Sequence, residues 1–525
     1  MSIKILITDP LSESGFKILQ KENFEIIYKP KIDQKSLINI ISDIDGWIIR
    51  SGTTIKEDHI RQAHNLQIIG RAGVGTDNID KQAATKYGII VMNVPDGNTI
   101  SAAEHTLAML MTLSRNIQLG HMGLMKGSWD RHLLVGNELR GKFLGVVGLG
   151  KIGREVIKRA LSFDMKILGY DPYINQEQFN KDEVKVVDLD YLTKNSDYIT
   201  LHVPLNDATR DLFDYKQLSK MKSNARIVNV ARGGIINESD LSKILNSDKI
   251  AGAAIDVYTK EPIDKDNPLL HCKNILLTPH LGASTIEAKE NVTATVCNQL
   301  IEYFNNNKLI NALNIPIADP SLFNKFASFY ILAEKIGIMQ SQLSQGPIKD
   351  VKVTCFGKAE DSKSIALAFL KGLLGGFIDN RVNFINADTV AKERGINFHH
   401  IYSNDELPYS NMIKIEVVSD ESISISGSVY DENHIRIVDI MGFKIDLEPS
   451  GVMLFVKNKD VPGVVGKVGT LLGKSHVNIK GYLLSKIKDK DFAYAVIKLE
   501  DKIKKSLIAD LNQLSSIQQI KQISI

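Results

Sequence analysis

The chain has 525 residues, which is too long for one ordinary hydrophobic core and predicts roughly three or four domains. Its composition is 43% hydrophobic and 24% charged with a net charge of +3, so neither nucleic-acid binding nor membrane binding is indicated. The three cysteines form no CxxC pair and the N-terminus lacks the pattern of a signal peptide, so we expect a cytoplasmic protein.

The first 95 residues alternate short apolar runs with helical patterns, which predicts a parallel sheet covered by helices on both faces. The expected strands are Ile3–Thr8, Phe24–Tyr28, Gly46–Ile49, Leu66–Arg71 and Ile89–Asn93, and the expected helices are Ser12–Lys21 and Gln34–Ser42.

Two arginines, Arg50 and Arg71, stand at the ends of predicted strands beside glycines that include Gly73. Ligands of open α/β sheets bind beyond the carboxyl ends of the strands. An arginine next to exposed backbone N–H groups is suited there to a carboxylate or a phosphate. Two surface arginines in ordinary ion pairs are the alternative, and the residues alone leave it open.

The pattern becomes helical at Ile100–Arg115, and Lys126–Glu138 follows as an exposed polar loop. This loop contains Trp129, Arg131 and His132. Such a loop could be solvated, or it could reach into the site of a neighbouring subunit.

Residues 142–171 contain a strand, a glycine turn, a helix, a second strand and a terminal acid, in that order. The glycines are Gly148, Gly150 and Gly153, and the acid is Asp171. The glycines permit a tight turn, a close approach of the backbone to a pyrophosphate, and close packing of helix on strand. The helix N-terminus attracts phosphate, and the acid accepts hydrogen bonds from ribose hydroxyls. No basic residue follows the acid, so the motif predicts NAD rather than NADP.

Three polar residues follow later strands of the same series: Arg232, Glu261 and His280. A lone histidine is more often structural, but an arginine, an acid and a histidine at strand ends of a dinucleotide domain indicate catalysis. The further strands of this series are expected at Tyr198–His202, Ala225–Asn229, Ala251–Ala254 and Asn274–Leu277. A helix at 284–306 is expected to cross back to the first lobe. The predicted lobes are therefore 1–95 with 285–312, and an inserted lobe at 96–284, followed by a linker at 314–319.

The last two hundred residues contain no catalytic signature. Residues 320–445 predict an α+β domain with a helix at Ser328–Leu343, and residues 451–525 predict the βαββαβ order of a ferredoxin-like domain with a role in binding or assembly. His399 and His400 have no acid or cysteine at ligand spacing, so we interpret them as a surface pair at a helix end, and no metal site is expected.

Eight segments of the chain together resemble one family, the long D-3-phosphoglycerate dehydrogenases within the D-2-hydroxyacid dehydrogenases. Six of them are typical of the superfamily: RAGVGTDNID (71–80), NTISAAEHTLAMLM (98–111), GLGKIG (148–153), NVARGGIINE (229–238), AAIDVYTKEP (253–262) and TPHLGAST (278–285). VNFINADTVAKERGI (382–396) resembles the intervening domain of the long form, and KDVPGVVGKVGTLLGKSHVNIKG (459–481) resembles its ACT regulatory domain. The implied fold is α/β: a flavodoxin-like substrate lobe and an inserted Rossmann lobe, both doubly wound, then an α+β intervening domain and an ACT domain.

The resemblance also implies roles for individual residues. His280 is the acid/base, Glu261 orients its imidazole, and Arg232 holds the substrate carboxylate. The implied cofactor-binding residues are Val74, Gly148, Gly150, Lys151, Ile152, Gly153, Asp171, Val203, Val230, Ala231, Arg232, Asp256, His280, Gly282 and Ala283, with Asp256 on the nicotinamide carboxamide. The implied substrate-binding residues are Arg50, Arg71, Gly73, Arg131 and Arg232, with Arg131 from a partner subunit. Asn458, Asp460 and Asn478 match positions that bind L-serine in feedback-inhibited relatives.

The implied activity is NAD-dependent oxidation of 3-phospho-D-glycerate to 3-phosphohydroxypyruvate, the first step of L-serine biosynthesis. Reduction of other 2-oxoacids, such as 2-oxoglutarate or glyoxylate, is the alternative within the same chemistry. A NAD-sensing protein that resembles the corepressor relatives is the alternative from another class. We expect a homodimer through the helix at 100–115 and the loop at 126–138, extended to a tetramer by the last two domains.

Overall fold

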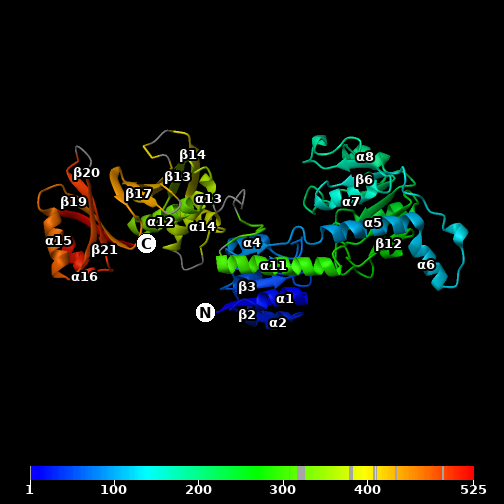
Figure 1. Ribbon diagram of the computed structural model, residues 1–525, viewed down its shortest axis with the longest axis horizontal. Helices are drawn as coiled ribbons and strands as arrows, with labels where there is room; N and C mark the ends of the chain where they lie inside the picture. The colour runs from blue at the N-terminus through cyan, green and yellow to red at the C-terminus, as the bar shows by residue number, and fades with distance from the viewer. Residues whose placement is uncertain are drawn as a thin grey trace.

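The computed structural model describes residues 2–306, 308–315, 325–377, 382–405, 408–409, 411–431, 434–486 and 490–525. These residues form sheets of five, seven, six and four strands. The corresponding units follow one another along an elongated molecule, with the seven-stranded unit at one end and the C-terminal unit at the other (Figure 1). Most of the predicted linker at 314–319 lies outside the described residues.

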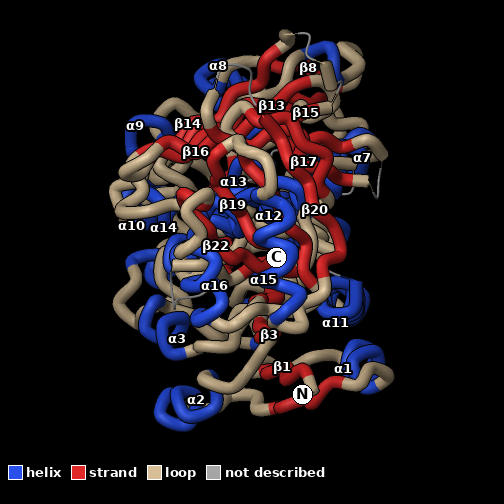
Figure 2. The backbone as a smooth tube through the Cα atoms, turned by 90° about the vertical axis from the view of Figure 1, so that its left-hand side faces the viewer, coloured by secondary structure: helices blue, strands red, loops and turns tan. Residues whose placement is uncertain are grey.

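The first lobe contains a parallel sheet with the order β2-β1-β3-β4-β5. Its strands are β1 Ile3–Ile7, β2 Phe24–Tyr28, β3 Gly46–Ile49, β4 Ile68–Arg71 and β5 Ile90–Met92. One face packs against α1 (Glu13–Gln20) and α11 (Ile286–Asn306), and the other against α2 (Gln34–Ile41), α3 (Glu57–Gln62) and α4 (Lys81–Lys86). This is the flavodoxin-like order, whose switch point lies between β1 and β3. End-on, β1, α1 and α2 lie at the bottom of the molecule (Figure 2).

The second lobe contains a parallel sheet with the order β12-β11-β10-β9-β6-β7-β8. Its strands are β6 Phe143–Val147, β7 Lys166–Tyr170, β8 Val184–Val186, β9 Tyr198–Leu201, β10 Arg226–Asn229, β11 Gly252–Ile255 and β12 Ile275–Leu277. One face is covered by α5 (Thr99–Arg115) and α7 (Lys151–Leu161), and the other by α8 (Leu189–Asn195), α9 (Tyr215–Leu218) and α10 (Glu238–Asn246). The order is that of a Rossmann fold with one added strand, and its switch point lies between β6 and β9. The predicted α/β class with two doubly wound lobes is confirmed.

The two connections between the lobes lie against each other. A Cβ at Gly97, just before α5, would overlap Val292 of α11. Gln299 of α11 donates through Nε2 to the carbonyl of Asn93, 3.1 Å away. The predicted returning helix is therefore present, and it packs on the first sheet beside the outgoing segment.

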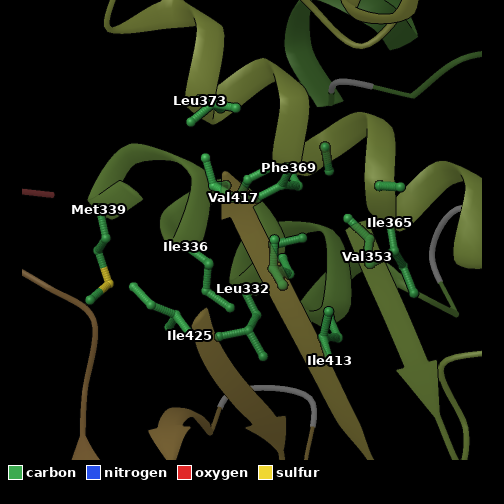
Figure 3. Close-up of a cluster of buried hydrophobic side chains, with 14 of the residues drawn as sticks. Leu332, Ile336, Met339, Val353, Ile365, Phe369, Leu373, Ile413, Val417 and Ile425 are labelled. Atoms are coloured by element: carbon green, nitrogen blue, oxygen red, sulfur yellow. The ribbon is translucent and has the colours of Figure 1, made fainter. Parts of the chain in front are cut away.

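The third unit contains the sheet β14-β13-β15-β16-β17-β18, in which only β13 and β14 are parallel. Its strands are β13 Asp350–Phe356, β14 Asn397–Ser403, β15 Met412–Val418, β16 Ser422–Val429, β17 Ile435–Ile440 and β18 Phe443–Leu447. Its helices are α12 Ala327–Leu343, α13 Ser362–Gly375 and α14 Ala387–Glu393. Side chains of α12 and α13 interdigitate with those of β13, β15 and β16 (Figure 3).

The helix-end interpretation of His399 and His400 was wrong. Both residues lie within β14, where His400 is paired with Val353 of β13. The strand, Asn397–Ser403, also contains Phe398, Ile401 and Tyr402. Aromatic and β-branched residues favour the pleated conformation, and this local preference was the signal that we missed.

The fourth unit has the antiparallel order β20-β21-β19-β22 of a ferredoxin-like fold. Its elements are β19 Val452–Lys459, α15 Val464–Lys474, β20 Ile479–Lys486, β21 Phe492–Leu499, α16 Lys505–Asn512 and β22 Ile517–Ser524. Helices α15 and α16 cover its outer face (Figure 1). Met453, Phe455 and Val496 point the other way and join the core of the third unit. The last two units therefore share one hydrophobic core.

The third unit is also anchored to the first lobe. Asn383 Nδ2 donates to the carbonyl of Gly88 at 2.5 Å, and Ile385 is buried in the core beneath α11. Among the described helices, none has the length and apolar character needed to cross a bilayer.

Candidate active site

The glycine turn after β6 leaves open space at the N-terminus of α7. Gly148 has φ 97°, and a Cβ there would collide with the carbonyl of His202. A Cβ at Gly153 would collide with the carbonyl of Gly148, so helix and strand pack too closely for any other residue. Gly150 caps α7 and its missing Cβ would meet nothing within 4 Å. A pyrophosphate can therefore approach the free N–H groups of the helix, and the turn fits a dinucleotide.

Asp171 follows β7 and is fixed beside this turn. Its Oδ2 accepts from the backbone N–H of Leu149 at 3.0 Å, and its Oδ1 accepts from that of Tyr173 at 3.0 Å. A carboxylate has about four acceptor positions, so lone pairs remain for ribose hydroxyls. Its negative charge disfavours a 2′-phosphate, which agrees with NAD.

The other predicted cofactor residues surround the same edge. Lys151 and Ile152 open α7, and the Lys151 ammonium pairs with Asp96 of the inter-lobe segment. Six more of the predicted residues follow the ends of β4, β9, β10 and β12: Val74, Val203, Val230, Ala231, Gly282 and Ala283. A Cβ at Gly282 would lie 3.0 Å from Val230, so the loops after β10 and β12 are adjacent.

His280 and Glu261 form a hydrogen-bonded pair, with Nδ1 and Oε2 2.6 Å apart. Glu261 also accepts through Oε1 from the backbone N–H of Tyr258 at 3.0 Å. Burial raises the pKa of Glu261, but the hydrogen bonds from His280 and Tyr258 outweigh it and hold the pKa below its ordinary value. The carboxylate is therefore ionised at neutral pH and fixes the imidazole through Nδ1, so that Nε2 is left for a ligand.

Asp256, at the end of β11, holds the loop that carries His280. Its carboxylate accepts from the backbone N–H groups of Leu281 at 2.8 Å and Gly282 at 2.9 Å, and from the hydroxyl of Thr278 at 2.6 Å. The side chain is fully buried. Its predicted contact with the nicotinamide carboxamide stays a prediction.

Three guanidinium groups gather where the two lobes meet. Arg232 follows β10 in the second lobe, and its Nε donates to Asp77 of the first lobe at 3.1 Å. Burial, together with the charges of Arg232 and Arg50, lowers the pKa of Arg71 to about 10, although Asp77 and Asp9 act in the opposite direction. The Arg71 Nε is buried without a hydrogen-bond partner in the described part of the chain. This excess positive charge is suited to an anion.

Two glycines make room for these arginines. Gly73 has φ 149°, and a Cβ there would overlap the Arg71 guanidinium. A Cβ at Gly75 would overlap the guanidinium of Arg232. The backbone conformation of Gly73 therefore favours glycine, and both glycines leave space that the guanidinium groups occupy.

Arg50 lies at the β1/β3 switch point of the first lobe. Its backbone N–H donates to Asp9 Oδ2 at 2.6 Å, and its guanidinium donates to the carbonyl of Pro10 at 3.2 Å. Asp9 also accepts from the backbone N–H of Thr53 at 3.1 Å. Arg50 lines a cavity of about 530 Å³ together with Lys31 and several hydroxyl groups. Asp9 and Asp77 were missed by the sequence analysis, although Asp77 lies inside a quoted motif.

Two predicted groups of residues are not brought together within one chain. Arg131 lies in the 3-10 turn Arg131–Leu133, in an exposed segment that follows α6 (Ile117–Met125). This segment lies at the far end of the second lobe, away from the first (Figure 1).

The predicted effector residues lie at opposite ends of the fourth sheet. Asn458 and Asp460 are at the end of β19, where Asn458 is paired with Ala493, and Asp460 contacts Lys486. Asn478 immediately precedes β20, whose first residue pairs with Leu499 at the other end, and its Nδ2 donates to Glu500 at 3.1 Å. One ligand could touch all three residues only between two copies of the chain.

Comparisons with known proteins agree with this geometry. Residues 107–282 match the family model "D-isomer specific 2-hydroxyacid dehydrogenase, NAD binding domain", and residues 325–441 match "D-3-phosphoglycerate dehydrogenase intervening domain". The chain is 38% identical to D-3-phosphoglycerate dehydrogenase of Archaeoglobus fulgidus over 93% of both chains. It is also 38% identical to that of Methanocaldococcus jannaschii over 100% of both chains. The chain belongs to the D-3-phosphoglycerate dehydrogenase family.

A solved structure of another dehydrogenase agrees with the fold and the cofactor. The NAD-dependent formate dehydrogenase of Staphylococcus aureus, solved in complex with NAD, superposes with a TM-score of 0.54 and 31% identity, over 61% of this chain and 98% of that one. The predicted family, NAD as cofactor and an NAD-dependent dehydrogenase activity are thus confirmed.

Proposed function

We propose that this family member oxidises 3-phospho-D-glycerate at C2 to 3-phosphohydroxypyruvate, the first step of L-serine biosynthesis. The observation that carries the proposal is the group of three arginines with its buried unpartnered Nε. Its Arg232 follows β10, and the hydrogen-bonded Glu261 and His280 follow the neighbouring parallel strands β11 and β12. A substrate with a carboxylate at one end and a phosphate at the other supplies the negative charge that the group of arginines lacks. The curated relatives named above bear the corresponding enzyme name.

The residues of the site divide the chemistry among them. NAD, when bound, supplies the acceptor for the hydride that leaves C2. Arg232 donates to the substrate carboxylate and orients C2, while Arg50 and Arg71 donate to the phosphate. His280 Nε2 accepts the proton of the C2 hydroxyl, and the ionised Glu261 stabilises the imidazolium that results.

We further propose that the enzyme is a homodimer through the second lobe, as its sequence predicts. Helix α6 has no buried residue, and Met125 and Trp129 are 76% and 78% exposed. Such a run of exposed apolar side chains is typical of a subunit interface. In that dimer, the partner's copy of the segment at 126–138 would add Arg131 to the phosphate-binding arginines. An L-serine effector site would likewise be shared by two ACT domains, with Asn458 and Asp460 from one and Asn478 from the other.

The deciding experiment measures NADH formation by the purified protein with 3-phosphoglycerate and NAD, with and without L-serine. Turnover supports the proposed substrate, and inhibition by serine supports the shared effector site. Reduction of 2-oxoglutarate or glyoxylate without phosphoglycerate turnover would instead favour the alternative 2-oxoacid reductase and remove the phosphate role of Arg50 and Arg71. A protein with stable protein partners and no turnover on any 2-hydroxyacid would favour the corepressor-like alternative.

A further inference from the structure

Helix α5 begins where the chain enters the second lobe, and two of its polar side chains point at the catalytic-histidine loop. Ser101 and His105 are four residues apart, so they lie one above the other on the same helix face. Ser101 is buried, and its Oγ donates to the carbonyl of Gly282 at 2.8 Å. His105 Nε2 lies 3.2 Å from Asp256 Oδ1.

Asp256 connects His105 to the backbone around His280. It accepts from the N–H groups of Leu281 and Gly282, and its own backbone carbonyl accepts from the N–H of His280 at 2.9 Å. Burial raises the pKa of Asp256, but the hydrogen bonds from His105, Thr278 and Leu281 outweigh it and keep the carboxyl ionised. Both backbone groups of Gly282 are therefore connected to α5. Its N–H donates to Asp256, which contacts His105 of α5, and its C=O accepts from Ser101 of α5.

His280 needs such support because its backbone is strained. Its φ is 55°, in the left-handed region that residues with a side chain rarely occupy. A strained conformation persists only where the surrounding contacts over-determine it. Asp256 and α5 supply four of the hydrogen bonds that fix residues 280–282, beside the bond between His280 and Glu261.

We propose that Ser101 and His105 are positioning residues, which hold the His280 loop through Gly282 and Asp256 and so place the imidazole for proton transfer. The proposal rests on the proposed function, since it needs His280 to be the proton acceptor. Neither residue touches the substrate in this arrangement. Because α5 starts at the crossing between the lobes, the same face links the position of the loop to the inter-lobe segment (Figure 1).

The test compares His105→Leu, His105→Gln and Ser101→Ala with the wild type. The glutamine amide can donate to Asp256 from nearly the position of the imidazole Nε2, and leucine cannot. We expect His105→Leu to lower kcat about 10- to 100-fold, because small misplacements of a catalytic group have effects of that size. Ser101→Ala should lower kcat less, and His105→Gln should restore most of the rate. The dissociation constant of NADH should stay within about twofold of the wild-type value in all three variants, since the glycine turn at Gly148–Gly153 is unchanged.

Ser114→Ala provides the matched control. Ser114 is also a buried serine of α5, but its hydroxyl donates to Tyr198 OH at 2.7 Å and has no contact with the loop. We expect it to lower thermal stability without lowering kcat. The solvent deuterium isotope effect on the single-turnover rate should rise in His105→Leu and not in Ser114→Ala, because only the former displaces the proton acceptor.

Wild-type kcat in both His105→Leu and Ser101→Ala, or an equal loss of kcat in Ser114→Ala, would overturn the inference while the proposed function stands. Equal losses in His105→Leu and His105→Gln would also overturn it, because the hydrogen bond would then not matter. A wild-type protein that oxidises no 2-hydroxyacid contradicts the proposed function itself, and the inference falls with it.

Discussion

The two catalytic lobes follow the same architectural rule and recognise their ligands with different chemistry. Both are parallel sheets with ligand-binding residues beyond the carboxyl ends of the strands. The second lobe offers backbone N–H groups, a helix N-terminus and one fixed carboxylate, Asp171. The first lobe offers neighbouring guanidinium groups whose charges disfavour one another, since Arg50 and Arg232 lower the pKa of Arg71. A cofactor site can thus be built from the backbone at little electrostatic cost, whereas a site for a doubly charged substrate requires charges that the free protein must tolerate.

The largest expected effect comes from substitution of His280, in the loop after β12. His280→Ala removes the proton acceptor, so kcat should fall by roughly 100- to 10,000-fold for every 2-hydroxyacid tested. NADH binding, measured by its fluorescence, should remain largely intact because the cradle at Gly148–Gly153 is unchanged. Unchanged turnover in this variant would refute the assigned mechanism.

A substitution in the first lobe should lower activity on a phosphorylated substrate more than on an unphosphorylated one. In the proposed complex Arg50→Ala removes a charged hydrogen bond to the phosphate, and such bonds contribute about 1.5–3 kcal/mol. That corresponds to a loss of roughly 10- to 150-fold in kcat/KM for 3-phosphoglycerate. Glyoxylate, which has no phosphate, should be reduced at nearly the wild-type rate. Arg61→Ala is the matched control, because Arg61 lies in the same lobe and pairs only with the exposed Asp58 in the described structure. Equal losses on both substrates would contradict the phosphate role of Arg50.

A substitution in the second lobe should change the use of NAD and NADP without changing the use of the substrate. Asp171→Ser removes the carboxylate that faces the ribose, so KM for NAD should rise by about tenfold, the effect of losing one good hydrogen bond to a charged group. The discrimination against NADP should fall, because the repulsion of the 2′-phosphate is gone. KM for 3-phosphoglycerate should stay within about twofold. A variant whose NAD/NADP preference is unchanged would show that this acid only stabilises the glycine turn through Leu149.

The contrast between the lobes also explains what the sequence could and could not predict. Short runs with a strong local pattern were located well: β2 and β3 have the bounds that their apolar runs predicted. Helix α13 was missed because Ser362–Gly375 is buried almost all round and lacks the polar face that marks a helix in a sequence. Edge strand β14 was missed for the opposite reason, since it is largely exposed and has no alternating apolar pattern. Edge strand β8 was missed because its three residues are too few to show a pattern.

The site shows the same division. The glycine motif carried its own local signal, and the structure gives it the predicted strand–turn–helix setting. The contacts of Arg232 with Asp77, of Arg50 with Asp9 and of His105 with Asp256 join residues 41 to 155 positions apart. Such pairs depend on the order of strands in the sheets and on how the lobes meet, which no local pattern encodes.

The smallest predicted effect tests whether the first lobe really carries unneutralised charge. The pKa of Arg71 is lowered to about 10 by burial and by its neighbouring arginines, so the charged form is disfavoured in the folded protein. For a cation, a folded pKa below the unfolded one means a destabilising contribution. It is fully present below the folded pKa of about 10 and is lost progressively as pH rises from there to the ordinary value of 12.5. Arg71→Met keeps the length of the stem without the charge, so it should raise Tm at neutral pH by roughly 2–4 °C, the shift that about 1 kcal/mol produces in a domain of this size.

Arg71→Lys is the control, because it keeps the charge and should give no such gain. Inorganic phosphate should raise Tm of the wild type and have much less effect on Arg71→Met, since the anion then has less charge to neutralise. A lower Tm for Arg71→Met than for Arg71→Lys, with the same response to phosphate, would show that Arg71 is held by ordinary packing. The expected result is that Arg71→Met is more stable than the wild type but binds the substrate poorly. It would show that the first lobe loses stability at a residue that the proposed function requires.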